Sequence, residues 1–197
     1  MKKWIVFALC LLLTGCSALP RPREMENMAL LRTLGVDYEN GVYILTASTG
    51  LRSEGGRQED SLILTGRGWD FPSALEDLKA NSDRTVFLGY VDQFLVGEGL
   101  WGPALLPLLD CAAHHGELSL GARLWAVKGL TGAQAVESGG SRGIEQRLNT
   151  LRLNGAENRS AGEVYSDLLE GKRTGLPTLI RDRGLLALRP EPLFIHI

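Results

Sequence analysis

The segment Leu34-Gly35-Val36-Asp37-Tyr38-Glu39-Asn40-Gly41-Val42-Tyr43-Ile44-Leu45-Thr46-Ala47-Ser48 contains two apolar runs joined by a short polar turn. The first run covers 34–37 and the second covers 42–48. Between them, Asn40-Gly41 is a pair that readily adopts the positive φ angles of a tight hairpin turn. The segment therefore predicts a β-hairpin near the start of the folded part of the chain.

The residues on either side extend this hairpin into an alternation of strands and helices. Before it, 24–32 carries apolar residues at helical spacing, which predicts a short helix. After it, the polar and glycine-rich stretch 49–60 predicts an exposed loop, and Asp70 followed by Pro72 is typical of a capped helix start. We expect strands over 61–65, 85–88, 93–96 and 123–127, and helices over 70–80, 104–114, 131–136, 144–153 and 162–169. This order predicts an α/β or α+β fold with a mixed β-sheet and flanking helices.

Composition limits the classes of protein to which the chain can belong. It has 197 residues, of which 44% are hydrophobic and 22% charged, enough to bury a core in one large domain or two small ones. The formal net charge is −2, from 21 basic and 23 acidic residues. This balance argues against a nucleic-acid-binding protein, because such proteins carry a basic surface.

The N-terminus has the pattern of a bacterial lipoprotein signal. Two lysines follow Met1, an almost entirely apolar run covers 4–13, and Leu13-Thr14-Gly15-Cys16 resembles a lipobox. The apolar run is too short for a permanent membrane span. We therefore predict lipidation of Cys16, which would become the mature N-terminus and anchor the chain to the extracytoplasmic face of the membrane. An ordinary secretory signal with a chance cysteine is the alternative.

The short motif Gly66-Arg67-Gly68 joins an expected strand to an expected helix, as dinucleotide-binding motifs do. Phe71 stands where such motifs have a third small residue, which lets the helix and the strand approach each other. We interpret the motif as a structural turn rather than a phosphate-binding loop.

Side chains that could bind a metal or act as a nucleophile occur together in Asp110-Cys111-Ala112-Ala113-His114-His115. On a helix, Cys111 and His115 share a face, as do Asp110 and His114. A metal site needs three or four ligands, and His196 is the only other histidine. We expect a helical turn with a buried Cys111, and no catalytic residue, cofactor or metal. A thiol- or metal-dependent hydrolase that uses Cys111 with His114 or His115 is the alternative.

Several motifs, in the same order, resemble the Ger(x)C family of spore-germination lipoproteins. The longest is Leu88-Gly89-Tyr90-Val91-Asp92-Gln93-Phe94-Leu95-Val96-Gly97-Glu98-Gly99-Leu100, which is similar to a family segment without gaps. Further similar motifs are Arg23-Glu24-Met25-Glu26, Leu34-Gly35-Val36-Asp37, Gly41-Val42-Tyr43, Thr65-Gly66-Arg67-Gly68 with 71–75, and Leu124-Trp125-Ala126-Val127-Lys128-Gly129. A weaker similarity covers 160–177, so that the resemblance spans most of 16–180.

This resemblance implies a non-enzymatic subunit of a spore germinant receptor. Members of the family are lipid-anchored on the outer face of the spore inner membrane and act with A- and B-type membrane subunits in nutrient-triggered germination. The chain departs from the family at Tyr90, where a His is common, and at 112–115, where Ala-Ala-His-His replaces an Arg-Asp pair. Typical members are also nearly twice as long. A solute-binding or envelope-structural lipoprotein unrelated to germination is the alternative.

The domain organisation follows from the signal, the resemblance and one flexible break. We expect a signal peptide over 1–15 and a lipid-anchored tether over 16–23. A mixed α/β core over 24–137 resembles the Ger(x)C N-terminal domain, and 138–197 forms a helical and extended part of the same domain. The break between the last two parts is Ser138-Gly139-Gly140-Ser141.

Overall fold

The computed structural model of the protein describes residues 27–54, 57–154, 157 and 159–195. Its strands are β1 (Met28–Leu30), β2 (Thr33–Glu39), β3 (Val42–Ser48), β4 (Arg52–Glu54), β5 (Arg57–Glu59), β6 (Ile63–Gly68), β7 (Thr85–Phe87), β8 (Gln93–Val96), β9 (Arg123–Val127), β10 (Thr174–Leu176), β11 (Thr178–Asp182), β12 (Leu185–Leu188) and β13 (Leu193–Ile195). Its helices are α2 (Phe71–Ala80), α3 (Leu105–His114), α4 (Gly132–Glu137), α5 (Glu145–Leu153) and α6 (Ala161–Leu169), with 3-10 turns η3 (Glu98–Leu100) and η4 (Gly140–Arg142).

A mixed seven-stranded sheet lies at the centre, in the order β12-β11-β9-β8-β2-β3-β6. The neighbours β2, β8, β9 and β11 run parallel to one another. At one side β3 and β6 continue the sheet antiparallel, and at the other side β12 does so. Three smaller two-stranded sheets, β1-β7, β4-β5 and β10-β13, lie outside it.

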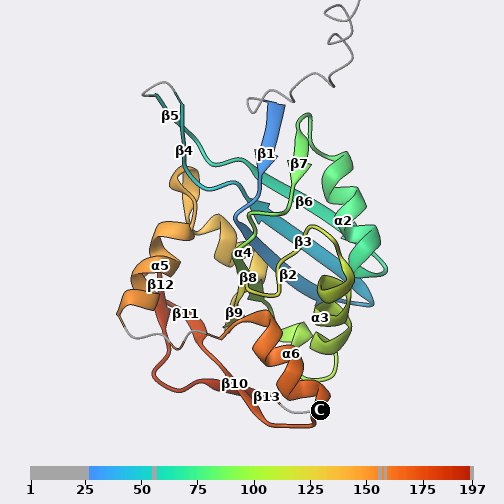
Figure 1. The fold of residues 1–197 in the computed structure, drawn as a ribbon. Coiled ribbons are helices and arrows are strands. Elements are labelled where there is room, and N and C mark those ends of the chain that lie inside the picture. The colour runs from blue at the N-terminus through green and yellow to red at the C-terminus, as the bar shows by residue number, and fades with distance from the viewer. Residues whose placement is uncertain (1–26, 55–56, 155–156, 158, 196–197) are drawn as a thin grey trace, which may run out of the picture.

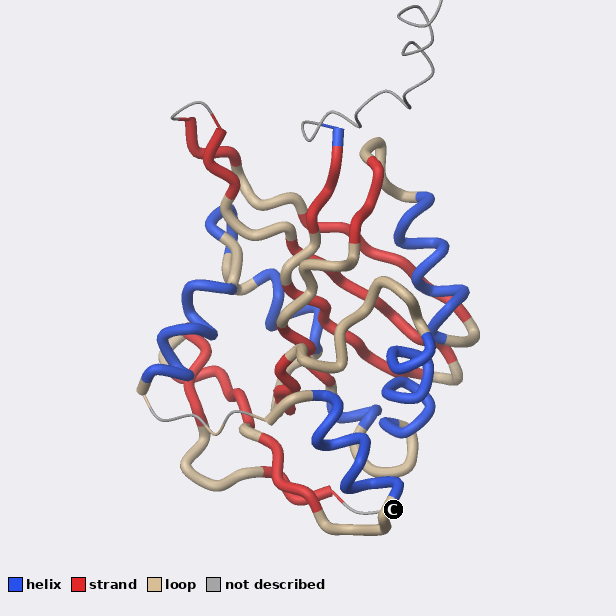
Figure 2. Tube along the Cα trace, in the orientation of Figure 1, coloured by secondary structure: helices blue, strands red, loops and turns tan. Residues whose placement is uncertain are grey.

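Helices cover both faces of this sheet (Figures 1 and 2). On one face, α2, α3 and α6 share a core with Phe94 and Val96 of β8. On the other, α4 and α5 share a core with Leu95 of the same strand and Trp125 of β9. Successive residues of a strand point to opposite faces, so each central strand contributes to both cores. The fold is thus α/β, with a mixed sheet and flanking helices, as the sequence predicted.

Local sequence explains the hairpin and the first helix after it. The β2-β3 turn places Asn40 at φ 52° and Gly41 at φ 82°, the positive angles that this pair was expected to adopt. At the start of α2 the Asp70 side chain accepts a hydrogen bond from the Ser73 backbone N–H at 2.8 Å. The Ser73 hydroxyl in turn accepts from the Asp70 N–H at 3.2 Å, which completes a capping box. Both predictions are confirmed.

The sequence predictions for two segments are wrong. Within 24–32, Met28–Leu30 is a strand and not part of the expected helix: β1 runs parallel to β7 with Ala29 opposite Val86. Its burial alternates with period two, because Ala29 and Leu31 are buried while Met28 and Leu30 are half-buried. In 49–60, expected to be a loop, β4 and β5 pair antiparallel. Both errors have one physical origin: strand pairing supplies backbone hydrogen bonds that helical spacing or polar composition does not reveal.

Two of the strands after the glycine-rich break, β11 and β12, continue the central sheet. In β11, Thr178 lies opposite Ala126 of β9, and the Ala126 N–H donates to the carbonyl oxygen of Pro177 at 3.0 Å. The segment 138–197 therefore supplies the last parallel strand, β11, and the antiparallel edge strand, β12.

Candidate interaction surface

Three hollows in the surface meet at Arg32, which connects β1 to β2. The first, of about 470 Å³, is lined by Met28, Leu30, Arg32, Thr49, Leu51, Asp60, Ser61, Leu62, Arg84 and Tyr90. The second, of about 430 Å³, is lined by Arg32, Gly50, Leu51, Arg142, Glu145, Gln146, Asn149, Thr150 and Leu153. The third, of about 470 Å³, is lined by Arg32, Gly89, Tyr90, Val91, Asp92, Ser119, Gly121 and Ala122. We call these residues together the Arg32 surface.

The backbone of Arg32 is held from both sides. Its N–H donates to the carbonyl oxygen of Ser48 at 2.8 Å, and its carbonyl accepts from the Asp92 N–H at 3.0 Å. The side chain, 45% exposed, reaches an Asp92 carboxylate oxygen at 3.5 Å. Because the main chain is fixed while the guanidinium lies at the surface, Arg32 presents its charge at a defined position.

Tyr90 lies in the turn between β7 and β8 and is 56% exposed. The turn is closed by the Val91 N–H, which donates to the Leu88 carbonyl oxygen at 2.9 Å. Val91 and Leu88 are both buried and hold the turn on the core. The Tyr90 ring meets Phe87 edge to face, with centroids 5.6 Å apart. These contacts hold the Tyr90 ring in place, and more than half of the residue's surface remains exposed for contact with a partner.

Glu145, the first residue of α5, fixes the wall of the second hollow. Its Oε1 accepts hydrogen bonds from the hydroxyls of Thr33 at 2.9 Å and Ser48 at 3.1 Å. Ser48 Oγ also accepts from the Gly50 N–H at 3.1 Å and lies 2.8 Å from Ser61 Oγ. This network joins α5 to the ends of β2 and β3. Within the described residues, Glu145 Oε2 is buried with no hydrogen-bond partner.

Several exposed apolar side chains lie on this surface. Of the seven large apolar side chains that are exposed in the described part of the chain, Leu51, Tyr90 and Leu153 line the hollows. Tyrosine and arginine are the residue types that most often dominate the binding energy of protein interfaces. The arrangement suits the binding of a partner.

The residues that the sequence marked for metal or thiol chemistry lie elsewhere, on and after α3. His114 Nδ1 donates to the backbone oxygen of Asp110 at 2.8 Å, and Asp110 Oδ1 accepts from the Tyr165 hydroxyl at 2.6 Å. His115 Nδ1 instead accepts from the Glu117 N–H at 3.3 Å. Cys111 packs half-buried against the core, and burial raises the pKa of its thiol, which disfavours the nucleophilic thiolate. Across the residues with described positions, no group of three or more His, Cys, Asp or Glu side chains could hold a metal ion.

The remaining predicted sites are the Gly66-Arg67-Gly68 motif and two residues outside the described ranges. A Cβ atom at Gly66 would collide with the backbone of Leu78, and one at Gly68 with that of Ala74, so α2 packs directly on these glycines. The motif is therefore not the turn that the sequence predicted: it forms the end of β6, paired with β3, and its two glycines let α2 pack directly on the strand. Cys16, the predicted lipidation site, and His196 lie outside the described residues.

The sequence did not predict the Arg32 surface. Its walls come from β1, the stretch 49–62, the turn 89–92 and α5, which the fold alone brings together. The apolar spacing of 24–32 also predicted a helix, so the alternation of buried and half-buried side chains along β1 was not expected. The one usable signal was Tyr90, an aromatic residue in a break between two strands.

The fold is that of an α/β domain, and comparison with known proteins identifies its family. The chain matches the model of the family described as "Spore germination protein N-terminal domain" over residues 21–138, more than half of its length. The protein therefore belongs to this spore germination family, the Ger(x)C family whose motifs its sequence resembles.

One solved structure matches at a distance, and no curated protein matches. The matching chain is titled "Crystal Structure of the GerBC protein", with 16% sequence identity and a TM-score of 0.38. The match covers 83% of the present chain and 51% of the solved one, so this chain spans about half the length of that protein. A likeness this distant carries no argument about the site.

Proposed function

We propose that this protein is a lipid-anchored subunit of a spore germinant receptor. It has no catalytic activity and contributes to nutrient-triggered germination through protein contacts at the membrane. The observation that carries this proposal is the family match over residues 21–138. The A- and B-type membrane subunits of the receptor are its partners, and the outer face of the spore inner membrane is its location.

The anchor in this proposal is Cys16, for which the lipobox Leu13-Thr14-Gly15-Cys16 is the support. Within the described ranges, no helix is long and apolar enough to cross a membrane. Two acyl chains on a single cysteine suffice for stable membrane attachment. A Cys16 modified in this way would hold the described domain at the membrane surface.

Metabolic labelling tests the anchor. Cells that express the full chain are grown with an alkyne-bearing fatty acid, and the protein is recovered and probed for label. We expect strong labelling of the wild type and of Cys111→Ala, and complete loss in Cys16→Ala. Label that persists in Cys16→Ala would show that the anchor is assigned to the wrong residue.

Deletion in the native spore-former tests the role. Spores without the gene should lose the response to at least one nutrient, and wild-type protein should restore it, whereas Cys16→Ala should restore it poorly. Spores that respond normally to every nutrient, in a strain without a redundant paralogue, would favour the unrelated solute-binding or envelope role.

A further inference from the structure

We infer that the Arg32 surface is the docking site for an outward-facing segment of an integral membrane protein, one that carries large apolar side chains next to an acidic residue. This inference rests on the proposed function and assigns the surface through which the lipoprotein meets its partner.

The apolar part of the partner follows from the first hollow. Met28 and Leu30 line it, and they alternate along β1 with Ala29 and Leu31, which are buried in the core. Leu51 and Leu62, from the two chain segments that lead to and from the β4-β5 pair, also line it, as does Tyr90. A hollow of about 470 Å³ with mainly apolar walls gains most from large apolar side chains, whose burial removes both surfaces from water.

The acidic part of the partner follows from Arg32. Among the described residues, its guanidinium pairs with Asp92 through one contact at 3.5 Å, and a guanidinium has five N–H donors, enough to bind a second carboxylate as well. A planar guanidinium binds a carboxylate with two parallel hydrogen bonds, and this geometry fixes orientation as well as adding energy. Arg32 lines all three hollows. A carboxylate of the partner that binds Arg32 therefore places the partner's neighbouring apolar side chains over the first and third hollows.

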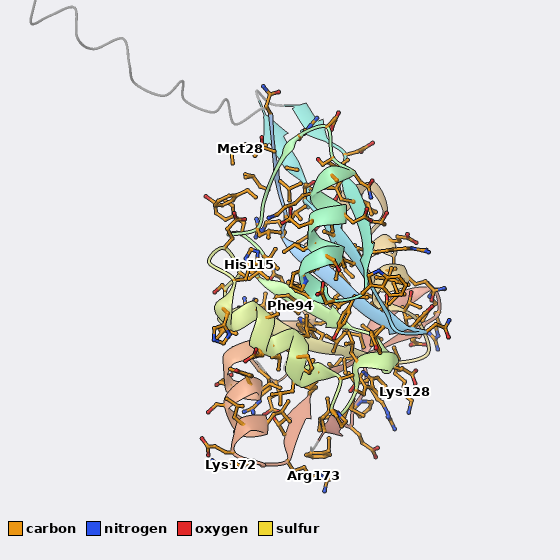
Figure 3. The ribbon with its side chains drawn as sticks, turned by 90° about the vertical axis from the view of Figure 1, so that its right-hand side faces the viewer. Met28, Phe94, His115, Lys128, Lys172 and Arg173 are labelled. Carbon is orange, nitrogen blue, oxygen red and sulfur yellow. The ribbon has the colours of Figure 1, made fainter. Side chains whose placement is uncertain are left out.

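The membrane origin of the partner follows from chain length. β1 is the first described strand, and Met28 is twelve residues after Cys16. Twelve fully extended residues span at most about 40 Å. Figure 3 shows Met28 at one end of the molecule and Lys172 and Arg173 at the other. When Cys16 is in the membrane, the Arg32 surface therefore belongs to the end held near it.

The test is site-specific photo-crosslinking in the native spore-former, with the full lipidated chain. p-Benzoylphenylalanine replaces Tyr90 or, as a matched control, Phe194. These two aromatic side chains are similarly exposed, 56% and 51%, and Phe194 stacks on Arg173 at the opposite end with its ring centroid 4.3 Å from the guanidinium carbon. We expect the probe at 90 to give an adduct with an integral membrane protein, mapped by mass spectrometry to an outward-facing segment, in at least fivefold higher yield than the probe at 194.

Charge reversal tests the acidic contact. Arg32→Glu should lower the adduct yield at 90 at least fivefold, and Arg32→Lys should retain part of it. Arg67→Glu makes the same change of charge at an exposed position on β6, away from the hollows, and should leave the yield unchanged. A basic residue in place of the acidic one in the crosslinked segment should restore the yield with Arg32→Glu.

Three outcomes would overturn the inference: equal yields at 90 and 194, adducts at 90 only with lipid or with a second copy of this chain, or no effect of Arg32→Glu. Yields are measured only in membranes where fatty-acid label on Cys16 is confirmed. A labelled, germination-active protein without these crosslinks refutes the surface alone, whereas an unlabelled protein or a normal deletion strain refutes the proposed function.

Discussion

At the scale of single residues, Asp37 is the most constrained charged group of the core. Its side chain is 4% exposed at the end of β2. Oδ1 accepts from the Gly132 N–H at 2.7 Å and Oδ2 from the Ala133 N–H at 3.0 Å, so the carboxylate caps α4 from a neighbouring strand. Burial raises the pKa of Asp37 above its ordinary value, and the two N–H donors oppose that rise without cancelling it.

This raised pKa predicts how stability depends on pH. The folded protein holds the Asp37 proton more tightly than the unfolded chain does, so protonation of Asp37 stabilises the fold. This contribution to the free energy of unfolding is fully present below the ordinary carboxyl pKa of about 3.9 and is lost as pH rises through the raised pKa of the folded state. Asp37→Asn does not titrate. The unfolding free energy of the wild type minus that of the variant should therefore fall as pH rises above about 4.

Urea unfolding at a series of pH values measures this difference. Trp125 is a suitable fluorescent reporter, because its ring is buried and its indole N–H donates to Gln93 Oε1 at 2.7 Å. Asp182→Asn, at an exposed position, serves as the control for a general loss of charge. A difference that stays flat or rises with pH for Asp37→Asn would contradict the prediction.

At the scale of elements, the packing of α2 on β6 depends on the absence of a side chain. Gly66→Ala places a Cβ against the backbone of Leu78 and the carbonyl oxygen of Ala74, so the helix must move away from the strand. We expect a loss of about 1–3 kcal/mol in unfolding free energy, the usual cost of overpacking. Gly116→Ala is the matched control, because no atom lies within 4 Å of its added Cβ, and it should stay within about 0.5 kcal/mol of the wild type. Equal effects in thermal or urea unfolding would show that α2 adapts freely.

The individual helices and strands also show which parts of the fold can be predicted from the sequence. Sequence reasoning predicted α2 because the capping residue Asp70 and the buried face of Phe71, Leu75 and Leu78 are encoded within ten residues of each other. It missed β1 because the partner that makes it a strand, β7, begins at Thr85, more than fifty residues later. It missed the Arg32 surface for the same reason, since hollows formed by distant segments leave no local pattern.

At the scale of the whole molecule, the central sheet crosses the glycine-rich break at 138–141. The family match ends at residue 138, but β9 takes its second parallel neighbour from β11, and the core around Trp125 includes Leu148 and Leu179. We therefore propose that 24–137 and 138–197 form one cooperative domain. A chain cut at the end of the family match would expose Trp125 and the unpaired edge of β9.

Truncation tests this unity. A chain that ends at residue 138 should lose the single cooperative urea transition of the full chain and should aggregate, because an uncovered apolar edge strand readily pairs with other chains. Adding residues 139–197 as a separate chain supplies β11, α5 and α6, and should restore part of the Trp125 fluorescence and of the cooperative transition. If the truncated chain instead unfolds cooperatively at the same urea concentration as the full one, the segment matched by the family is a domain in its own right, and the later strands are an addition to a sheet that is already stable.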